Sequence, residues 1–218
     1  MTTPPTDNLP STTQAHGADQ AQSSAAMASQ VREQLLGRSV VLVGLMGSGK
    51  SSVGRRLAAR LGMEFRDADT EIEEAAGMSI ADIFQLHGEG EFRAGETRVI
   101  ARLMGEQPMV LATGGGAWMA QDTRDAVAKA AISVWLDAEL DILMERVGRR
   151  SHRPLLQNAD PRGTMERLLA DRNPVYALAD TRILSRDVPH DHVVDEIVQT
   201  LHDHLNGADN GRGDGVVG

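Results

Sequence analysis

Cysteine is absent from the 218 residues of this chain, and aromatic side chains make up only 3% of it. The absence of cysteine excludes a disulfide framework, a thiolate metal site and a cysteine nucleophile. Because aromatic residues are scarce, Leu, Ile, Val, Met and Ala must build the core. No apolar run approaches the length that spans a bilayer, so we expect no membrane partner and a cytoplasmic location.

Lysine is nearly absent as well, since Lys50 and Lys129 are the only two among 22 basic residues. The net charge at pH 7 is −9, and no basic stripe interleaved with aromatic residues occurs, so we expect no nucleic acid partner. A protein of this charge that binds anionic ligands must gather its arginines locally.

The two ends of the chain differ in composition from its middle. Residues 1–30 are mostly Thr, Ser, Pro, Gln and Ala without one Lys or Arg, and the stretch from Asn206 is rich in glycine. We therefore expect a disordered tail at 1–34, one compact domain at 35–205, and a second disordered tail at 206–218.

Between the tails, short apolar runs alternate with stretches of helical spacing. Three continuous apolar runs are typical of strands covered on both faces of a parallel sheet: 39–43, 109–112 and 132–136. Four stretches carry apolar residues at helical spacing: 50–61, 79–104, 139–149 and 191–205. Strands that alternate with helices indicate βαβ units, so the fold class is α/β.

The sequence GLMGSGKS at 44–51 matches the pattern G-x-x-x-x-G-K-[ST] between an apolar run and a helix. In such a loop the backbone N–H groups point at a phosphate, Lys50 reaches the β- and γ-phosphates, and Ser51 ligates Mg²⁺. A chance turn between strand and helix is the alternative. We predict that the nucleotide phosphates contact the following residues: Gly47, Ser48, Gly49, Lys50, Ser51 and Ser52.

Two aspartates follow in the stretch FRDAD at 65–69. If this stretch is extended, Asp67 and Asp69 point to the same side and form a paired-carboxylate edge. One could hold a Mg²⁺-bound water while the other accepts a hydroxyl proton, as phosphoryl transfer requires. The alternative is that Asp69 only caps a helix that begins near Thr70.

Arginines recur farther along the chain beside glycines and prolines. Arg93 and Glu96 are three residues apart on the predicted helix at 79–104, so the carboxylate could orient the guanidinium, although a solvated ion pair is the usual reading. The glycines of TGGGA at 113–117 follow an apolar run, where ligands of open α/β sheets bind. The basic stretch at 146–156 could close over a triphosphate as a lid, or be a solvated helix end.

Five motifs now stand in order: GLMGSGKS, FRDAD, GEGEFRAGE, TGGGA, and RPLL followed by RNPVY. Together they resemble shikimate kinase over 39–205. The resemblance implies a nucleoside-monophosphate-kinase-like, three-layer αβα fold with a five-stranded parallel sheet in the order 2-3-1-4-5, and a mobile lid around 148–160. It implies transfer of the ATP γ-phosphate to the 3-hydroxyl of shikimate in aromatic amino-acid biosynthesis, with Mg²⁺ as cofactor.

The resemblance also implies roles for residues on the acceptor side. Asp69 would bind the shikimate hydroxyls and serve as the base, and Glu96 would orient Arg93. The shikimate carboxylate would be held by four residues: Arg93, Arg172, Gly115 and Gly116.

On the nucleotide side, the resemblance makes Lys50 and the lid residue Arg153 catalytic. Arg146 matches the position of an arginine that stacks on adenine, and the loop at 185–190 would close over the other face of the base. Mg²⁺ would be held by Ser51 and, through water, by Asp67. We expect a monomer.

Two other functions remain open. A gluconate-type kinase would use the same fold, although a carboxylate-binding Arg93 together with RPLL and RNPVY favours shikimate. A catalytically silent nucleotide-binding homologue would be expected to lack Lys50, Asp69 or Arg153, and all three are present. The pairs His190/His192 and His202/His204 are interpreted as a solvated helical face rather than a metal site.

Overall fold

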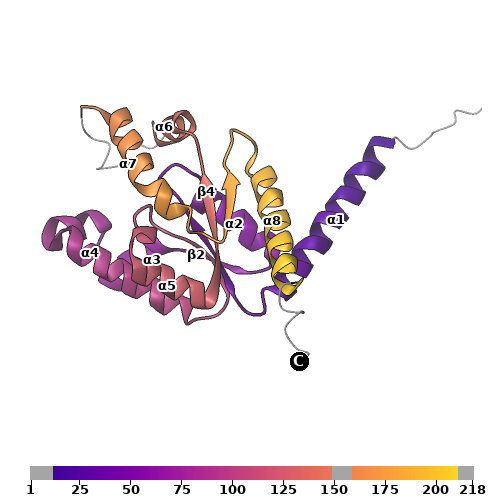
Figure 1. The fold of residues 1–218 in the computed structure, drawn as a ribbon, viewed down its shortest axis with the longest axis horizontal. Coiled ribbons are helices and arrows are strands. Elements are labelled where there is room, and N and C mark those ends of the chain that lie inside the picture. Colours follow the sequence, from indigo (N-terminus) through magenta and orange to yellow (C-terminus); the bar gives the residue numbers. More distant parts are fainter. Residues whose placement is uncertain (1–11, 149–158, 211–218) are drawn as a thin grey trace, which may run out of the picture.

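The computed structural model describes residues 12–148 and 159–210. Within them, one five-stranded sheet forms the centre of the molecule, with every strand pair parallel. Helices cover both of its faces, so the architecture is a three-layer αβα sandwich (Figure 1). The strand order is β2-β3-β1-β4-β5, which confirms the predicted order 2-3-1-4-5. The strands are β1 (Ser39–Val43), β2 (Glu64–Asp67), β3 (Met109–Ala112), β4 (Ala131–Asp137) and β5 (Thr181–Leu184).

The helices divide between the two faces of the sheet. One face packs against α1 (Thr12–Gln34), α2 (Lys50–Leu61) and α8 (His190–Asn210). The other face packs against α4 (Ile80–Met104), α5 (Gln121–Ala130), α6 (Leu140–Gly148) and α7 (Pro161–Tyr176). Short elements complete the chain: α3 (Ala68–Ala76) and the 3₁₀ turn η1 (Ala117–Met119). No helix in the described part of the chain is long and apolar enough to cross a membrane.

The central strands are apolar along their whole length because both faces are covered. Every residue of β1, β3 and β4 is buried, in agreement with the three predicted strands. In contrast, β5 lies at the edge of the sheet and alternates buried and exposed residues, so it has no continuous apolar run.

The predicted helix at 79–104 exists but is broken once. Ser79 caps it by accepting a hydrogen bond from the backbone N–H of Asp82 at 3.1 Å. Gly88 has φ 80° and ψ 171°, a conformation that glycine adopts without steric cost, and it separates two helical segments. Arg93 and Glu96 lie on the second segment, beyond the break.

The prediction of a disordered tail at 1–34 was wrong for Thr12–Gln34, which form α1. Ala28, Val31 and Leu35 are buried against the face of the sheet that α2 and α8 also cover. These apolar residues are spaced three and four positions apart and form a stripe only one residue wide. The polar residues around them concealed this helical pattern in the sequence. At the other end, α8 continues past the predicted boundary at 205 to Asn210. Residues 1–11 and 211–218 of the predicted tails lie outside the described residues.

The docking of α1 predicts that Val31→Ala lowers the free energy of unfolding by roughly 2 kcal/mol, because it leaves a cavity at a fully buried site. Gln30→Ala, at the exposed neighbouring position, should change it by less than about 0.5 kcal/mol. Urea denaturation measures both values. An unchanged midpoint for Val31→Ala would show that α1 does not pack on the domain in solution.

Candidate active site

The glycine-rich loop connects β1 to α2 at the carboxyl edge of the sheet. Gly44 has φ 137°, and a Cβ there would lie 2.5 Å from the carbonyl oxygen of Leu136. Lys50 is the first residue of α2, and its Nζ donates to the carbonyl oxygens of Gly44 at 2.8 Å and Leu45 at 3.0 Å. The loop therefore curls around the lysine amine, as the sequence motif predicts.

A cleft of about 390 Å³ opens beside this loop. It is lined from the loop and α2, from the ends of β2 and β3, and from the segment after β5. Most of the predicted phosphate-binding residues line it: Gly47, Gly49, Lys50, Ser51 and Ser52. Ser48 is fully buried and does not line the cleft. Its predicted contact with a phosphate therefore remains a prediction.

The two aspartates reach the cleft in a different way from the one predicted. The strand ends at Asp67, and Asp69 lies in the first turn of α3, so the condition of an extended 65–69 is not met. Asp67 rather than Asp69 caps α3, since its side chain accepts from the backbone N–H of Asp69 at 3.2 Å. The second carboxylate oxygen of Asp67 accepts from Ser51 Oγ at 2.7 Å. Both carboxylates nevertheless line the cleft.

The half-buried Arg93 forms an ion pair with the buried Glu96 on α4. Arg93 Nη1 donates to Glu96 Oε2 at 2.8 Å, and Glu96 is only 1% exposed, which rules out a solvated surface pair. Burial raises the pKa of Glu96, and the nearby charge of Asp69 adds to this, while the Arg93 guanidinium opposes it. Within the described ranges, Oε1 of Glu96 has no hydrogen-bond partner. The guanidinium of Arg93 is thus held in place by a carboxylate that has no access to water.

The glycine run after β3 brings together the residues that the sequence predicts for the acceptor side. A Cβ on Gly114 would lie 2.5 Å from Glu96 Oε1 and 3.0 Å from Asp69 Oδ1, so both carboxylates face this glycine. A Cβ on Gly116 would lie 2.6 Å from Arg93 Nη1. A side chain at either position would displace these groups, which explains the glycines at 114 and 116.

Arg172 comes from α7 on the opposite side of the glycine run. Its Nη1 donates to the carbonyl oxygen of Gly115 at 3.0 Å, and the hydroxyl of Tyr176 donates to the same oxygen. Arg172 and Arg93 therefore approach neighbouring glycines, as two arginines that grip one ligand would. Tyr176 was not predicted from the sequence, because the motif gives no sign that its hydroxyl reaches this loop.

Arg146 and the segment after β5 bound the side of the cleft that the sequence predicts for the nucleotide. Arg146 Nη1 donates to Ser185 Oγ at 2.9 Å, and its Nη2 donates to the carbonyl oxygen of Arg186 at 2.7 Å. The predicted loop at 185–190 contributes three residues to the lining: Asp187, Val188 and His190. Arg146 and this loop are therefore on the same side of the cleft, where the adenine of a bound nucleotide is predicted to lie.

His190 is half-buried and lines the cleft, so the interpretation of its pair as a solvated helical face was wrong for this residue. Burial lowers its pKa, and the charges of Arg56 and Arg146 lower it further. His190 is thus biased toward the neutral form at the edge of the cleft. Across the described residues, no group of three His, Asp or Glu side chains gathers in a way that could hold a metal ion.

Arg153 and most of the predicted lid lie outside the described residues. The lid role of Arg153 remains a prediction.

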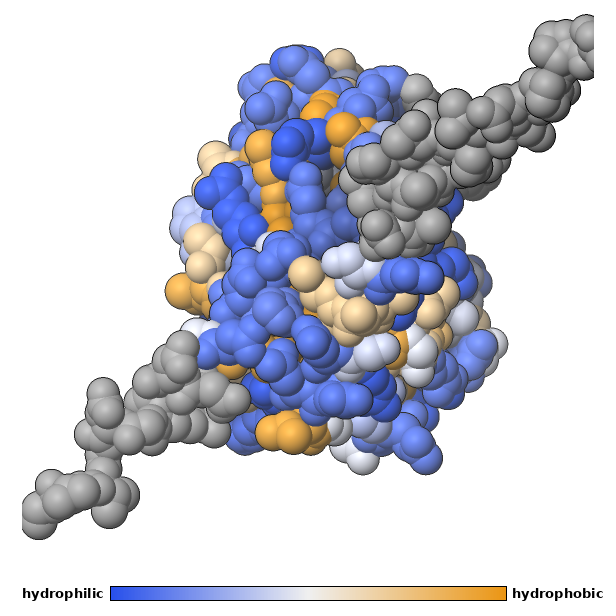
Figure 2. Space-filling model, turned by 90° about the vertical axis from the view of Figure 1, so that its right-hand side faces the viewer, coloured by the Kyte–Doolittle hydropathy of each residue, from blue (hydrophilic) through white to orange (hydrophobic). Residues whose placement is uncertain are grey.

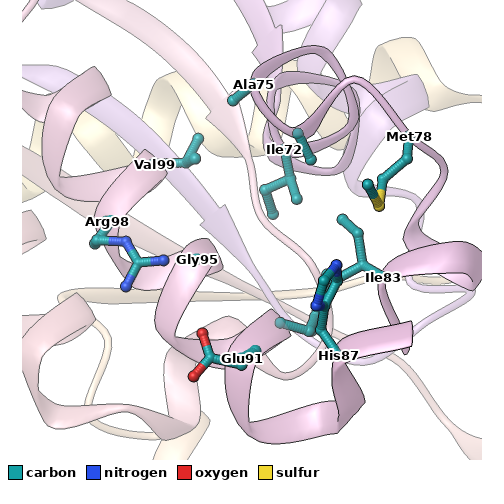
Figure 3. Close-up of a pocket in the computed structure, with 11 residues that line it drawn as sticks. Ile72, Ala75, Met78, Ile83, His87, Glu91, Gly95, Arg98 and Val99 are labelled. Carbon is teal, nitrogen blue, oxygen red and sulfur yellow. The ribbon is translucent and has the colours of Figure 1, made fainter. Parts of the chain in front are cut away.

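A second cavity, of about 450 Å³, lies between α3 and α4 (Figure 3). Its walls are mostly apolar and include Ile72, Met78 and Ile83, with Glu91 and Arg98 also lining it. None of the predicted site residues lines it. It is therefore separate from the cleft beside the glycine-rich loop.

The molecule seen from the side of α1 shows polar surface broken by scattered apolar patches rather than one continuous apolar face (Figure 2). This view identifies no further candidate for the functional site, and the cleft at the carboxyl edge of the sheet is the candidate that the predicted residues share.

Comparisons with known proteins point to one family. The family model for shikimate kinase matches residues 46–202. A shikimate kinase from Bradyrhizobium diazoefficiens is 62% identical over 170 residues, which cover 78% of this chain and 82% of that protein. One from Rhodopseudomonas palustris is 60% identical over 168 residues, covering 77% and 83%. The structure of a shikimate kinase from Acinetobacter baumannii in complex with shikimate aligns with a TM-score of 0.69 at 35% identity, covering 81% of this chain and 96% of that one.

Proposed function

The chain belongs to the shikimate kinase family, and we propose that in its cleft the γ-phosphoryl group of ATP is transferred to the 3-hydroxyl of shikimate. The observation that carries the assignment of residues is the buried Glu96, which holds Arg93 against the glycine run at one end of a phosphate-loop cleft. A phosphate site and a carboxylate site that share one cleft match a kinase whose acceptor is a small hydroxy acid.

ATP would bind with its phosphates against the loop between β1 and α2. The backbone N–H groups of Gly47 and Gly49 and the N-terminus of α2 supply donors and a positive dipole end. Lys50 would exchange part of its carbonyl contacts for the β- and γ-phosphate oxygens, since its Nζ already lies at the loop. The adenine base of ATP would lie between Arg146 and the segment at 187–190.

The residues present also fit Mg²⁺. Ser51 Oγ and Asp67 Oδ2 lie 2.7 Å apart in the cleft, and hydroxyl and carboxylate oxygens are ligands that Mg²⁺ prefers. Ser51 would bind the ion directly and Asp67 through water. When bound, Mg²⁺ neutralises the charge of the phosphate oxygens.

Shikimate would bind with its carboxylate between Arg93 and Arg172, beside the backbone of Gly115 and Gly116. Each guanidinium can offer two parallel N–H donors to a carboxylate. Glu96 keeps the fork of Arg93 in one orientation before the ligand arrives, so less side-chain entropy is lost on binding.

Asp69 is the proposed base. The oxygen of the 3-hydroxyl forms a bond to the γ-phosphorus while the bond from that phosphorus to the β,γ-bridging oxygen breaks, and Asp69 accepts the hydroxyl proton. The products are ADP, which keeps the bridging oxygen, and shikimate 3-phosphate. Arg153 of the lid would approach the transferred group.

We further propose that the enzyme acts as a monomer in the cytoplasm, where a chain without cysteine needs no oxidising compartment.

The assignment predicts that purified protein with ATP and Mg²⁺ releases ADP when shikimate is added, and not with gluconate, quinate or no acceptor. Asp69→Asn should lower kcat by at least about 100-fold, because it removes the proton acceptor without changing the shape of the site. Turnover with gluconate alone would reject shikimate as the acceptor. Tight ATP binding without turnover on any acceptor would identify a silent homologue.

The two carboxylates that pair with Arg93 allow a matched comparison. Glu96 is buried, whereas Glu89, which contacts Arg93 at 3.3 Å, has a side chain that is 67% exposed. Glu96→Gln should raise KM for shikimate roughly tenfold, because it weakens a buried charge-assisted hydrogen bond. Glu89→Gln should change KM by less than about twofold, since exposed pairs contribute little. Equal effects of the two substitutions in steady-state kinetics would contradict the role given to Glu96.

A further inference from the structure

The carbonyl oxygen of Gly115 accepts two hydrogen bonds from side chains of α7. One donor is Arg172 Nη1, at 3.0 Å, and the other is the hydroxyl of Tyr176. Arg172 and Tyr176 are four residues apart, so both lie on the same face of the helix and can reach one atom. A carbonyl oxygen has two lone pairs, so these two donors use its full hydrogen-bonding capacity.

The neighbouring carbonyls of the glycine run are held by the backbone instead. The N–H of Ala117 donates to Gly114 O at 3.2 Å, and the N–H of Met119 donates to Gly116 O at 3.1 Å. In the described part of the chain, no backbone N–H donates to Gly115 O. The peptide group between Gly115 and Gly116 is therefore the one whose orientation depends on side chains.

Glycine makes this dependence important. A peptide group is planar, so the direction of its carbonyl fixes the direction of its N–H. With glycine on both sides, the group can rotate as a unit with little steric resistance. Anchoring Gly115 O thus fixes how the backbone of Gly115 and Gly116 is presented beside Arg93, and it also fixes the point to which Arg172 is attached.

Tyr176 is better suited to this task than Arg172. In the proposed function Arg172 must also bind the acceptor carboxylate, whereas Tyr176 is fully buried and cannot touch a ligand in the cleft. Its ring packs beside Trp135, with ring centres 6.1 Å apart, so its position is set by the core. Burial raises the pKa of Tyr176 to about 12, so the hydroxyl keeps its proton and remains a donor at any working pH.

We propose that Tyr176 is a positioning residue for the acceptor: its buried hydroxyl locks the peptide between Gly115 and Gly116 and so holds the glycine run and Arg172 in the arrangement that binds the shikimate carboxylate. This inference rests on the proposed function, because it assigns a purpose to groups that the function places at the acceptor. It adds the last residue of RNPVY, which touches no substrate, to the machinery of substrate recognition.

The test is Tyr176→Phe, which removes one oxygen and keeps the ring in the core. Loss of this anchor should raise KM for shikimate about tenfold, the effect expected when a buried carbonyl loses a hydrogen bond. KM for ATP should stay within about twofold and kcat within about threefold, since the phosphate loop and Asp69 are untouched. Ser133→Ala is the matched control, because it also removes a buried hydroxyl. That hydroxyl donates to Asp180 Oδ2 over 2.6 Å, and neither residue lines the cleft. The control should leave both KM values unchanged.

Wild-type turnover is measured first, so that failure of the kinase assignment is distinguished from failure of this inference. If the wild type phosphorylates shikimate and Tyr176→Phe leaves its KM unchanged, or raises both KM values equally, the positioning role is rejected.

A second measurement does not depend on the folding of any variant. Tyr176 is the only tyrosine of the chain, so biosynthetic incorporation of 3-fluorotyrosine labels this position alone. The inference predicts that saturating shikimate shifts the ¹⁹F resonance. The ligand carboxylate binds Arg172, and Arg172 donates to the same Gly115 carbonyl as the tyrosine hydroxyl. A resonance that does not move when shikimate saturates the protein would overturn the inference.

Discussion

The site depends on one geometric constraint: the carboxyl ends of parallel strands meet at the same edge of a sheet. With β1 in the middle, flanked by β3 and β4, the loop that follows β1 lies next to the glycine run that follows β3. Asp67 ends β2 on the far side of β3, so its carboxylate reaches Ser51 across that edge. Phosphate loop, carboxylates and glycine run therefore converge without any long connection.

Charge is concentrated on this edge and is compensated before any ligand binds. The chain carries a net charge of −9, yet Lys50, Arg146 and Arg172 are all turned toward the cleft or its glycine run. Each is held by carbonyl or hydroxyl oxygens, and Arg93 is held by the buried Glu96. Because these oxygens fix the cations in place, anionic ligands meet a site that is already ordered.

The loop motifs and the buried strands were predictable because each depends on local sequence: glycines where the backbone curls, and continuous apolar runs where both faces are covered. The pairing of Arg93 with Glu96 was predictable from their spacing, but its burial was not, since that depends on the glycine run packed above it. The position of Asp69 could not be predicted because α3 begins directly after β2 with no turn residue between them. Tyr176 was missed because its partner is a backbone carbonyl 61 residues away, which leaves no pattern in the sequence.

The most direct test of the central claim is to identify the phosphorylated position by ³¹P and ¹H NMR of the product made from ATP and shikimate. The account predicts one phosphate ester, coupled to the proton on carbon 3, in equal amount to the ADP released. A phosphate on another hydroxyl, or ADP with inorganic phosphate and unchanged shikimate, would contradict the arrangement of Asp69, Arg93 and Arg172 around the acceptor.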